Sequence, residues 1–160
     1  MDNDYNNVLQ GKDAISSKMA KAFVTIKDKR IHAINFIQFE AKINKNKVDV
    51  PRLGSYGMAK KSVGWDGEFS GKIHYVSSDF VLLLEEYKNT GEDVYFEIQV
   101  TNSDPTSAAG EQTIIYENCN LNGGTLSKFD AEGDLLTEEV EGTFDNFHVV
   151  KAFNALPGMA

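Results

Sequence analysis

Apolar and polar residues alternate over a long stretch near the start of the chain, from Ile31 to Lys47. A period of two over this length predicts a β-strand pair with one buried face. The alternation leads into 48–66, a charged segment rich in glycine, which is predicted to be a long loop that contacts another molecule. The mostly apolar parity consists of Ile31, Ala33, Ile37, Phe39, Ala41 and Ile43.

Shorter alternating stretches predict further strands, and turn-forming residues separate them. The charged residues 27–30 predict a hairpin turn, and Leu126 and Phe129 are expected to resume a strand after the break at 122–124. The parity of the last stretch changes between Phe144 and Phe147, which predicts a β-bulge. These strands are expected at 22–26, 68–75, 94–100, 112–121 and 136–150.

One segment has the period of a helix. Phe80, Leu83, Leu84 and Tyr87 lie at i, i+3, i+4 and i+7, and Gly91 follows as a C-cap candidate, so a helix is predicted over 78–89. One apolar stripe suffices to cover one face or end of a sheet. The predicted fold is mainly β: a small antiparallel β-barrel or sandwich of six or seven strands with one packed α-helix.

Length and composition indicate a single domain over residues 1–160, with an N-terminal arm at 1–20 and a C-terminal tail at 151–160. The N-terminal residues lack the basic and apolar regions of a signal peptide, and no apolar run approaches the roughly 20 residues of a membrane span. The single cysteine, Cys119, excludes an internal disulfide framework and is expected to be buried. We therefore expect synthesis in a cytosol.

Charge is distributed unevenly along the chain. The net charge is −8, which is unfavourable for binding nucleic acid. Residues 1–72 carry 13 basic and 8 acidic side chains, whereas residues 73–160 carry 3 and 16. This division has two interpretations: chance combined with solvation, or head-to-tail complementarity between copies, which steers the formation of rings and stacks.

The residues show no catalytic or metal-binding constellation. His32 and His74 lie on the polar parity of their strands, and the adjacent acidic pairs diverge on a strand or helix. Gly54–Gly57 is not followed by the Lys-[Ser/Thr] of a phosphate-binding loop. We expect no enzymatic activity, no cofactor and no metal.

Basic residues near the predicted loop have two interpretations. They could protect an exposed strand edge from unwanted pairing, or they could form the positive side of an intersubunit contact, which we favour because a long glycine-containing loop follows. The predicted contact residues are Lys45, Lys47, Arg52, Tyr56, Lys60, Lys61 and Trp65. The predicted acidic complementary surface consists of Glu132, Asp134, Glu138, Glu139 and Glu141.

Through a series of short sequence motifs in a fixed order, the chain resembles the core tail-tube proteins of contractile-tailed phages. This is the PBSX-like family, which includes R-type phage-tail-like bacteriocins. The resemblance covers about residues 20–150. The motifs are F-E-A-x-x-x-K-N-K from Phe39, the turn ending at Gly54, the glycine-rich entry into a strand at 64–75, S-x-F-V-L-L from Ser78, and E-E-V-x-x-T-F-x-x-F from Glu138.

The resemblance implies a structural protein whose hexameric rings join their inner strands into one barrel and stack into a hollow tube, with the loop 48–66 contacting a neighbouring copy. It implies as partners a tail sheath, baseplate and terminator proteins, and DNA that passes without specific binding. The chain would be made in the bacterial cytoplasm and end in the virion tail or bacteriocin particle, without inserting into a membrane itself. A type VI-like secreted tube protein and a small ligand-binding β-barrel remain as alternatives.

Overall fold

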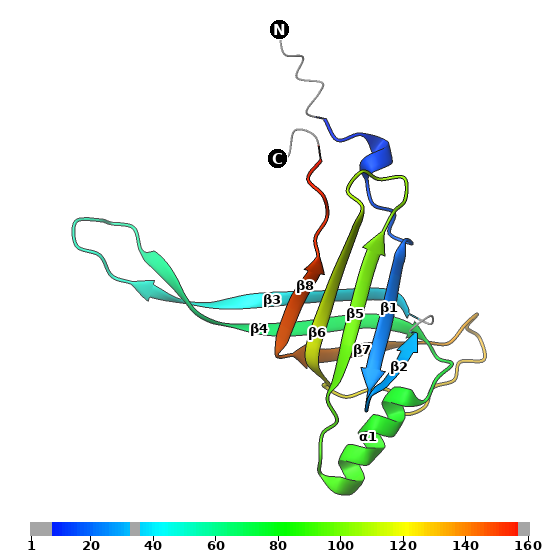
Figure 1. The fold of residues 1–160 in the computed structure, drawn as a ribbon. Helices are drawn as coiled ribbons and strands as arrows, with labels where there is room; N and C mark the ends of the chain where they lie inside the picture. The colour runs from blue at the N-terminus through cyan, green and yellow to red at the C-terminus, as the bar shows by residue number, and fades with distance from the viewer. Residues whose placement is uncertain (1–7, 33–35, 157–160) are drawn as a thin grey trace. The chain divides into compact units, whose positions relative to one another are not determined.

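The structure is a computed structural model that describes residues 8–32 and 36–156 (Figure 1). The described chain forms two compact units. Unit 1 comprises residues 8–32, 96–117 and 147–156, and unit 2 comprises residues 36–95 and 118–146. Residues 1–7 of the predicted arm, Ala33 of the alternating stretch and residues 157–160 of the predicted tail lie outside the described residues.

Unit 1 is an antiparallel arrangement that begins with the short 3₁₀ helix η2 (Gly11–Asp13). It contains β1 (Ala20–Ile26), β2 (Lys29–His32), β5 (Phe96–Ser103), the first part of β6 (Glu111–Leu121) and most of β8 (Asn146–Lys151). Strands β2, β1, β5 and β6 are neighbours in this order, and β8 also pairs with β6. The core of unit 1 includes Val24, Phe96 and Ile98, which are almost completely buried.

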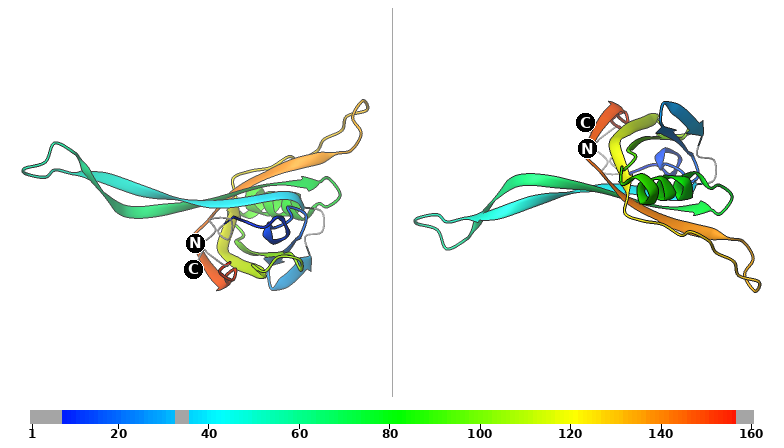
Figure 2. Two further views of the ribbon diagram at one scale, coloured as in Figure 1. Left: turned by 90° about the horizontal axis from the view of Figure 1, so that it is seen from above. Right: turned by 90° about the horizontal axis from the view of Figure 1, so that it is seen from below.

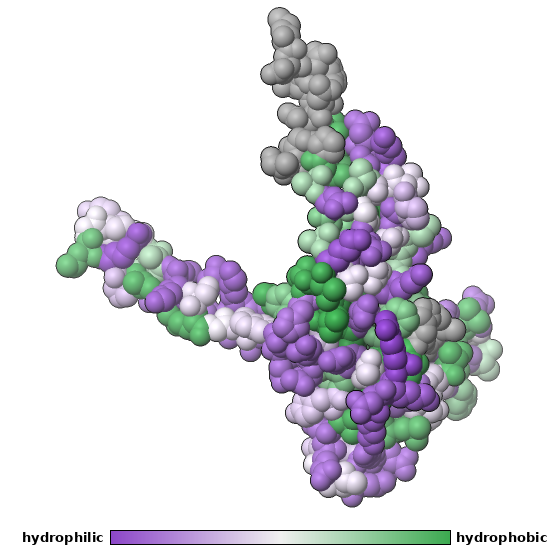
Figure 3. Space-filling model, in the orientation of Figure 1, coloured by the Kyte–Doolittle hydropathy of each residue, from purple (hydrophilic) through white to green (hydrophobic). Residues whose placement is uncertain are grey.

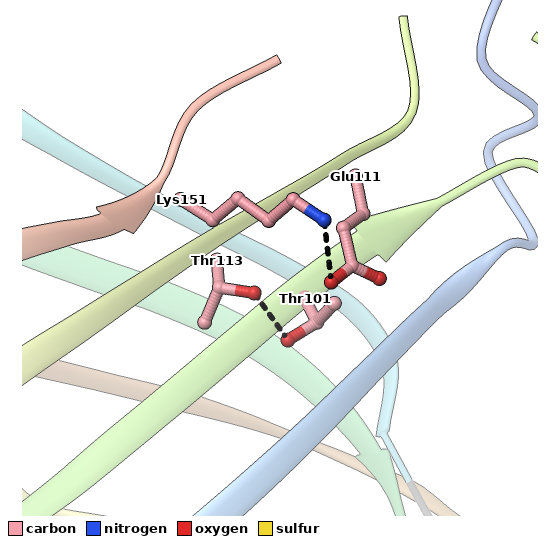
Figure 4. Close-up of polar contacts among 4 residues, drawn as sticks. All are labelled: Thr101, Glu111, Thr113 and Lys151. Atoms are coloured by element: carbon pink, nitrogen blue, oxygen red, sulfur yellow. Dashed lines mark hydrogen bonds and ion pairs between the residues drawn. The ribbon is translucent and has the colours of Figure 1, made fainter. Parts of the chain in front are cut away.

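Polar contacts also link neighbouring strands of unit 1 (Figure 4). The hydroxyls of Thr101 on β5 and Thr113 on β6 lie 3.0 Å apart, and Lys151 Nζ on β8 donates to Glu111 Oε1 on β6 at 3.3 Å. Each such cross-strand pair contributes roughly 0.2–1 kcal/mol.

The predicted hairpin turn at 27–30 is present, and its backbone explains its tightness. Lys27 and Asp28 have φ values of 49° and 65°, and Ile26 pairs with Lys29. Two consecutive central residues with positive φ define a type I′ turn, whose twist matches that of the flanking strands.

Residues 8–19 pack on unit 1 through η2. Asp13 is buried, and its Oδ1 accepts a hydrogen bond from Ala108 N at 2.9 Å. Ser107 Oγ donates to the backbone oxygen of Asp13 at 2.7 Å, and Ser16 N donates to Asp104 Oδ2 at 3.1 Å. This part of the predicted arm is therefore fixed to the loop that joins β5 and β6.

Unit 2 is built on a long hairpin, β3 (Phe36–Val50) and β4 (Ala59–His74), which Figure 2 shows from two sides. Strand β7 (Thr137–Phe144) pairs with β4, and residues 120–121 at the end of β6 pair with β7. The strand order is β6–β7–β4–β3, and the described pairs are antiparallel. Phe69, Ile73, Val140, Phe144 and Cys119 are buried, as expected for Cys119.

The prediction of a loop over 48–66 is wrong for most of these residues. Residues 48–50 pair with 59–61, and the pairing continues to Asp66, so the loop between the strands is confined to 51–58. A register shift next to Asn46 accommodates the extra residue Val63. Charged and glycine residues are tolerated here because this ribbon is exposed on both faces, so no buried face selects strand-forming side chains.

Helix α1 (Asp79–Thr90) confirms the predicted helix with a shift of one residue at each end. Gly91 has φ 75°, and its N–H donates to Tyr87 O at 2.8 Å, which forms the predicted left-handed C-cap. Leu83 is buried, whereas Tyr87, placed on the same predicted face, is 52% exposed.

Two strand expectations near the end of the chain are wrong in detail. Residues 122–136 do not continue β6, and Phe129 is 91% exposed. The predicted bulge at residue 145 is a complete break, because β7 ends at Phe144 in unit 2 and β8 begins at Asn146 on the way into unit 1.

The fold class is confirmed: the chain is mainly β and antiparallel, with one α-helix among the described residues. Strand β3 lies at one end of the strand order and β2 at the other. The pairing of the described strands therefore does not close into a barrel.

Candidate assembly surfaces

Two glycines of unit 2 lie directly beneath aromatic rings of the neighbouring strand. Gly67 on β4 is the partner of Phe144 on β7, and Gly142 on β7 is the partner of Phe69 on β4. A Cβ atom added to Gly67 would lie 2.5 Å from the Phe144 ring, and one added to Gly142 would lie 2.6 Å from the Phe69 ring. Side chains at these positions would displace the rings, so the two strands depend on glycine here.

The same face carries a row of aromatic contacts. The rings of Phe36 and Phe39 meet edge to face with centroids 6.0 Å apart, and Phe39 stacks on Phe69 at 6.1 Å. Trp65 contacts Phe144 at 6.2 Å and stays 40% exposed. This apolar face therefore continues from the buried core of unit 2 onto the base of the projecting hairpin.

The opposite face of the sheet is polar and exposed. Along β3, β4 and β7, alternate residues point to this face, and register places them side by side. It carries more acids than bases, with Lys42 and Lys72 as its cations. The exposed residues of this polar face are Gln38, Glu40, Lys42, Asn44, Asp66, Glu68, Ser70, Lys72, Glu139, Glu141 and Thr143.

One cation of the polar face is paired within the chain. Lys42 Nζ lies 3.2 Å from Glu68 Oε1, and Asn44 Nδ2 donates to the same oxygen at 3.3 Å. The hydrogen bonds from Lys42 and Asn44, with the charge of Lys42, lower the pKa of Glu68 below its usual value. The lysine charge is therefore offset locally, and the face as a whole stays acidic.

All seven predicted contact residues lie on the β3–β4 hairpin, and their surroundings differ. Arg52 Nη2 donates to Ser55 Oγ at 3.3 Å and to Gly57 O at 3.2 Å, so this side chain organises the loop. Lys60 forms an ion pair with its cross-strand partner Asp49 at 3.1 Å. Lys45 stands opposite Trp65, and the exposed residues Lys47, Tyr56 and Lys61 complete the predicted set.

The predicted acidic surface is divided between three places. Glu132 and Asp134 lie in the exposed segment 122–136, and Glu139 and Glu141 lie on the polar face of β7. Glu138 lies apart from the others, because this residue is 6% exposed and shares the buried parity of Val140. Neighbouring residues of a strand point to opposite faces, so Glu138 and Glu139 cannot belong to one surface.

Burial has a consequence for the ionisation of Glu138. Desolvation raises the pKa of this carboxyl, and the positive charge of Lys128 partly opposes the rise. Lys128 Nζ itself donates to the backbone oxygen of Thr137 at 2.9 Å, which places the ammonium beside the start of β7.

Apart from Tyr56 and Trp65, sequence reasoning missed the exposed apolar side chains of these surfaces. Large apolar side chains are exposed at both ends of unit 2, among them Leu53, Met58, Leu126, Phe129 and Leu135. Figure 3 shows hydrophobic residues interspersed with hydrophilic ones along the projecting hairpin. The polar parity of 66–72 was a usable signal for the polar face, because every second residue there is polar or charged.

Residues 8–32 and 36–156 contain no group of three or more His, Cys, Asp or Glu side chains that could hold a metal ion. None of the helices in these ranges has the length and apolar character that crossing a membrane requires.

The fold is shared with components of contractile injection systems, which defines the structural class. A chain in the cryo-EM structure of the anti-feeding prophage baseplate matches 86% of this chain and 95% of its own length, with a TM-score of 0.69 at 8% identity. A chain of the PVC sheath/tube terminator, from an extracellular contractile injection system, gives a TM-score of 0.65 at 13% identity, with 86% and 97% covered. At these identities the likeness concerns the fold.

The sequence itself places the chain within this class. A family model described as phage tail tube protein matches residues 7–151, so the chain belongs to the phage tail tube protein family. The phage-like element PBSX protein XkdM of Bacillus subtilis (strain 168) is 29% identical over 141 residues, which cover 88% of this chain and 93% of XkdM. The resemblance to PBSX-like tube proteins is confirmed, and the chain is a structural protein of tail tubes.

Proposed function

We propose that six copies of this chain join edge to edge into a closed ring and that rings stack into the hollow inner tube of a contractile tail. The observation that carries the proposal is the open border of the unit 2 sheet. Strand β3 has 15 residues, ends the strand order, and pairs with β4 among the described strands. An exposed edge of this length is a template for another strand unless it is covered.

The opposite border of the same sheet is also partly open. The pairing described between β6 and β7 joins residues 120–121 to 142–143, which leaves the first half of β7 beyond the end of β6. Two open borders on one sheet allow each copy to add to the next. Closure into a ring then removes the edges, as in a barrel.

The dimensions suit a channel. Four strands per copy and six copies would give about 24 strands, and a strand spacing near 4.8 Å with a tilt near 40° gives a barrel roughly 45–50 Å across between backbones. We place the polar face on the channel side, because an acidic wall repels phosphates and would let DNA pass without adhering. A bacteriocin tube would need only a wetted, polar wall of the same kind.

The proposed partners follow from this role. The tube would be covered by a sheath protein and would end on baseplate and terminator proteins, with its subunits made in the bacterial cytoplasm and incorporated into the virion tail or a phage-tail-like particle. The role is structural and not catalytic, and needs no cofactor.

Adjacent proline substitutions in β3 test the edge. Along a strand, successive N–H groups point alternately to the two neighbours, so of Lys42→Pro and Ile43→Pro one removes a hydrogen bond to β4 and the other removes a donor from the open edge. The edge variant should retain the melting temperature of the unassembled protein and form no rings or tubes in electron micrographs. Normal tubes from a variant with an unchanged melting temperature would contradict the proposal.

A further inference from the structure

The two ends of the unit 2 sheet carry exposed apolar side chains in oppositely charged surroundings. At one end lies the tip, residues 51–58 between β3 and β4. At the other end lies the acidic segment, residues 122–136, which leads into β7 beside the end of β4. Figure 2 shows the tip and the acidic segment projecting in opposite directions from the shared strands.

The tip presents apolar side chains on an ordered turn. Leu53 and Tyr56 are fully exposed, and Met58 is 57% exposed. The two hydrogen bonds of the Arg52 guanidinium bridge the turn, and Gly54 supplies a φ of 76° that the turn requires. A turn that is already ordered loses little conformational entropy when it binds.

The acidic segment is similarly built. Leu126, Phe129 and Leu135 are between 68% and 91% exposed. Asp130 Oδ1 accepts a hydrogen bond from Glu132 N at 3.0 Å, and Tyr75 Oη on the chain after β4 donates to Leu126 O at 3.2 Å. The segment therefore offers exposed apolar side chains on a fixed turn, beside the carboxylates of residues 130, 132 and 134.

Distance excludes contact of these surfaces within one copy, and opposite charge favours their contact between copies. Residues 47–61 carry four basic side chains and one acidic one, whereas residues 122–136 carry three acidic side chains and one basic one. The 16 residues of β4 separate the two ends by about 50 Å. A surface at one end that complements a surface at the other is the arrangement of a head-to-tail contact.

We propose that the tip of one copy seats on the acidic segment of the next copy, with Leu53, Tyr56 and Met58 packed against Leu126, Phe129 and Leu135. Lys47 and Lys61 at the base of the tip then face Glu132 and Asp134, which steer the contact. This inference rests on the proposed tube function and assigns the two chain segments that meet in it. It also accounts for apolar side chains that a monomer would otherwise leave in water.

Cross-linking tests which segments meet. The native thiol, Cys119, is buried, so introduced cysteines are the reactive ones. Met58→Cys and Ser127→Cys each leave the other apolar side chains in place. When the two single variants are mixed and co-assembled, we expect a short bis-maleimide to join them into a covalent dimer. With the variant that carries both cysteines, we expect the same reagent to give a ladder of covalent multimers. The control pairs Met58→Cys with Glu85→Cys, on the exposed side of α1, and should give no such product.

Charge reversal tests the steering. Lys47→Glu/Lys61→Glu should abolish tube formation, and adding Glu132→Lys/Asp134→Lys should restore it. Lys18→Glu/Lys88→Glu changes the net charge equally at exposed residues outside 47–61 and should leave assembly unchanged.

The outcomes separate this inference from the proposed function. Normal tubes of the cysteine variants with no cross-link between residues 58 and 127 would overturn the inference and leave the tube function standing. Failure of Glu132→Lys/Asp134→Lys to restore tubes to Lys47→Glu/Lys61→Glu would do the same. Absence of rings and tubes from the unmodified protein would count against the function itself. Binding of the protein to anionic phospholipid vesicles that is lost with Lys47→Glu/Lys61→Glu, without cross-linking, would assign the tip to a membrane and also overturn the inference.

Discussion

Substitution of Gly142 by alanine tests the close packing of β7 against its neighbours. The added Cβ would lie 2.6 Å from the Phe69 ring and would collide with the backbone oxygen of Asn120. A backbone atom cannot rotate away, so the strand pairing between β6 and β7 must shift. Overpacking of this kind costs typically 1–3 kcal/mol, and we take the upper part of that range because backbone is involved.

A smaller effect acts in the opposite direction. Replacing glycine in a strand interior removes conformational freedom from the unfolded chain and stabilises by roughly 0.5–1 kcal/mol. The net loss expected for Gly142→Ala is therefore about 2 kcal/mol. For a chain of this length that corresponds to a fall in Tm of roughly 4–8 °C.

Gly64→Ala provides the matched control on the same sheet. The Cβ added at Gly64 would meet its nearest neighbour, Asn46 Nδ2, at 3.8 Å, which is an ordinary contact distance. This variant should be as stable as the unmodified protein or slightly more stable. Gly67→Ala should fall between the two, because its Cβ meets side-chain atoms of Phe144 that can move.

Thermal unfolding followed by circular dichroism, on protein shown to be unassembled by size-exclusion chromatography, gives the three values of Tm. Equal stability of Gly142→Ala and Gly64→Ala would refute the close approach of β7 to Phe69 and Asn120.

Three further predictions concern other parts of the chain. Leu83→Asp places a charge at a residue that is 9% exposed and should destabilise the protein by more than about 3 kcal/mol. Leu82→Asp, at a residue that is 59% exposed, should change stability by less than about 1 kcal/mol. Equal effects of the two substitutions in urea unfolding would show that the buried face of α1 is misassigned. Burial raises the pKa of Glu138 in the folded protein, so the ionised carboxylate lowers the free energy of unfolding. This loss grows as pH rises from below about 4.3, the pKa of the unfolded chain, through the raised pKa of the folded protein. Glu138→Gln should therefore have a higher Tm than the unmodified protein at pH 7.5 and an equal one near pH 3.5, and a lower Tm at pH 7.5 would contradict the assigned cause. Replacing Lys27-Asp28 by Asn-Gly suits the type I′ turn better and should raise Tm by roughly 2–4 °C; an unchanged or lower value would argue against positive φ at both positions.

Periodicity predicted most elements of the fold because it reports which side of an element is buried. Helix α1 was found from its period, and the turn at 27–30 was found from its run of charged residues. The outer part of the β3–β4 hairpin was not, because a ribbon exposed on both faces shows no alternation of apolar and polar residues. Glycine and charge there were interpreted as a loop, although cross-strand pairing continues to Val50 and Ala59.

The candidate surfaces were predicted in part, for a related reason. Charge along the chain indicated that the hairpin is basic and the later residues acidic, which the structure places on the tip and on 122–136. The exposure of Leu53 and Phe129 could not be predicted, because an apolar residue in a loop is equally compatible with a core position. The buried side chain of Glu138 was missed because adjacent acids were treated as one surface, although a strand separates them.

The alternation of the chain between units 1 and 2 has a consequence for how the protein is made. Strand β4 acquires its second neighbour only when β7 has been synthesised, and β6 acquires β8 later still. A growing polypeptide on the ribosome therefore displays the β3–β4 ribbon without the completed sheet that a neighbour would recognise. If neighbours add to the completed sheet, as proposed above, addition has to wait until β7 is made, which limits the time in which a nascent chain could join its neighbours on a polysome.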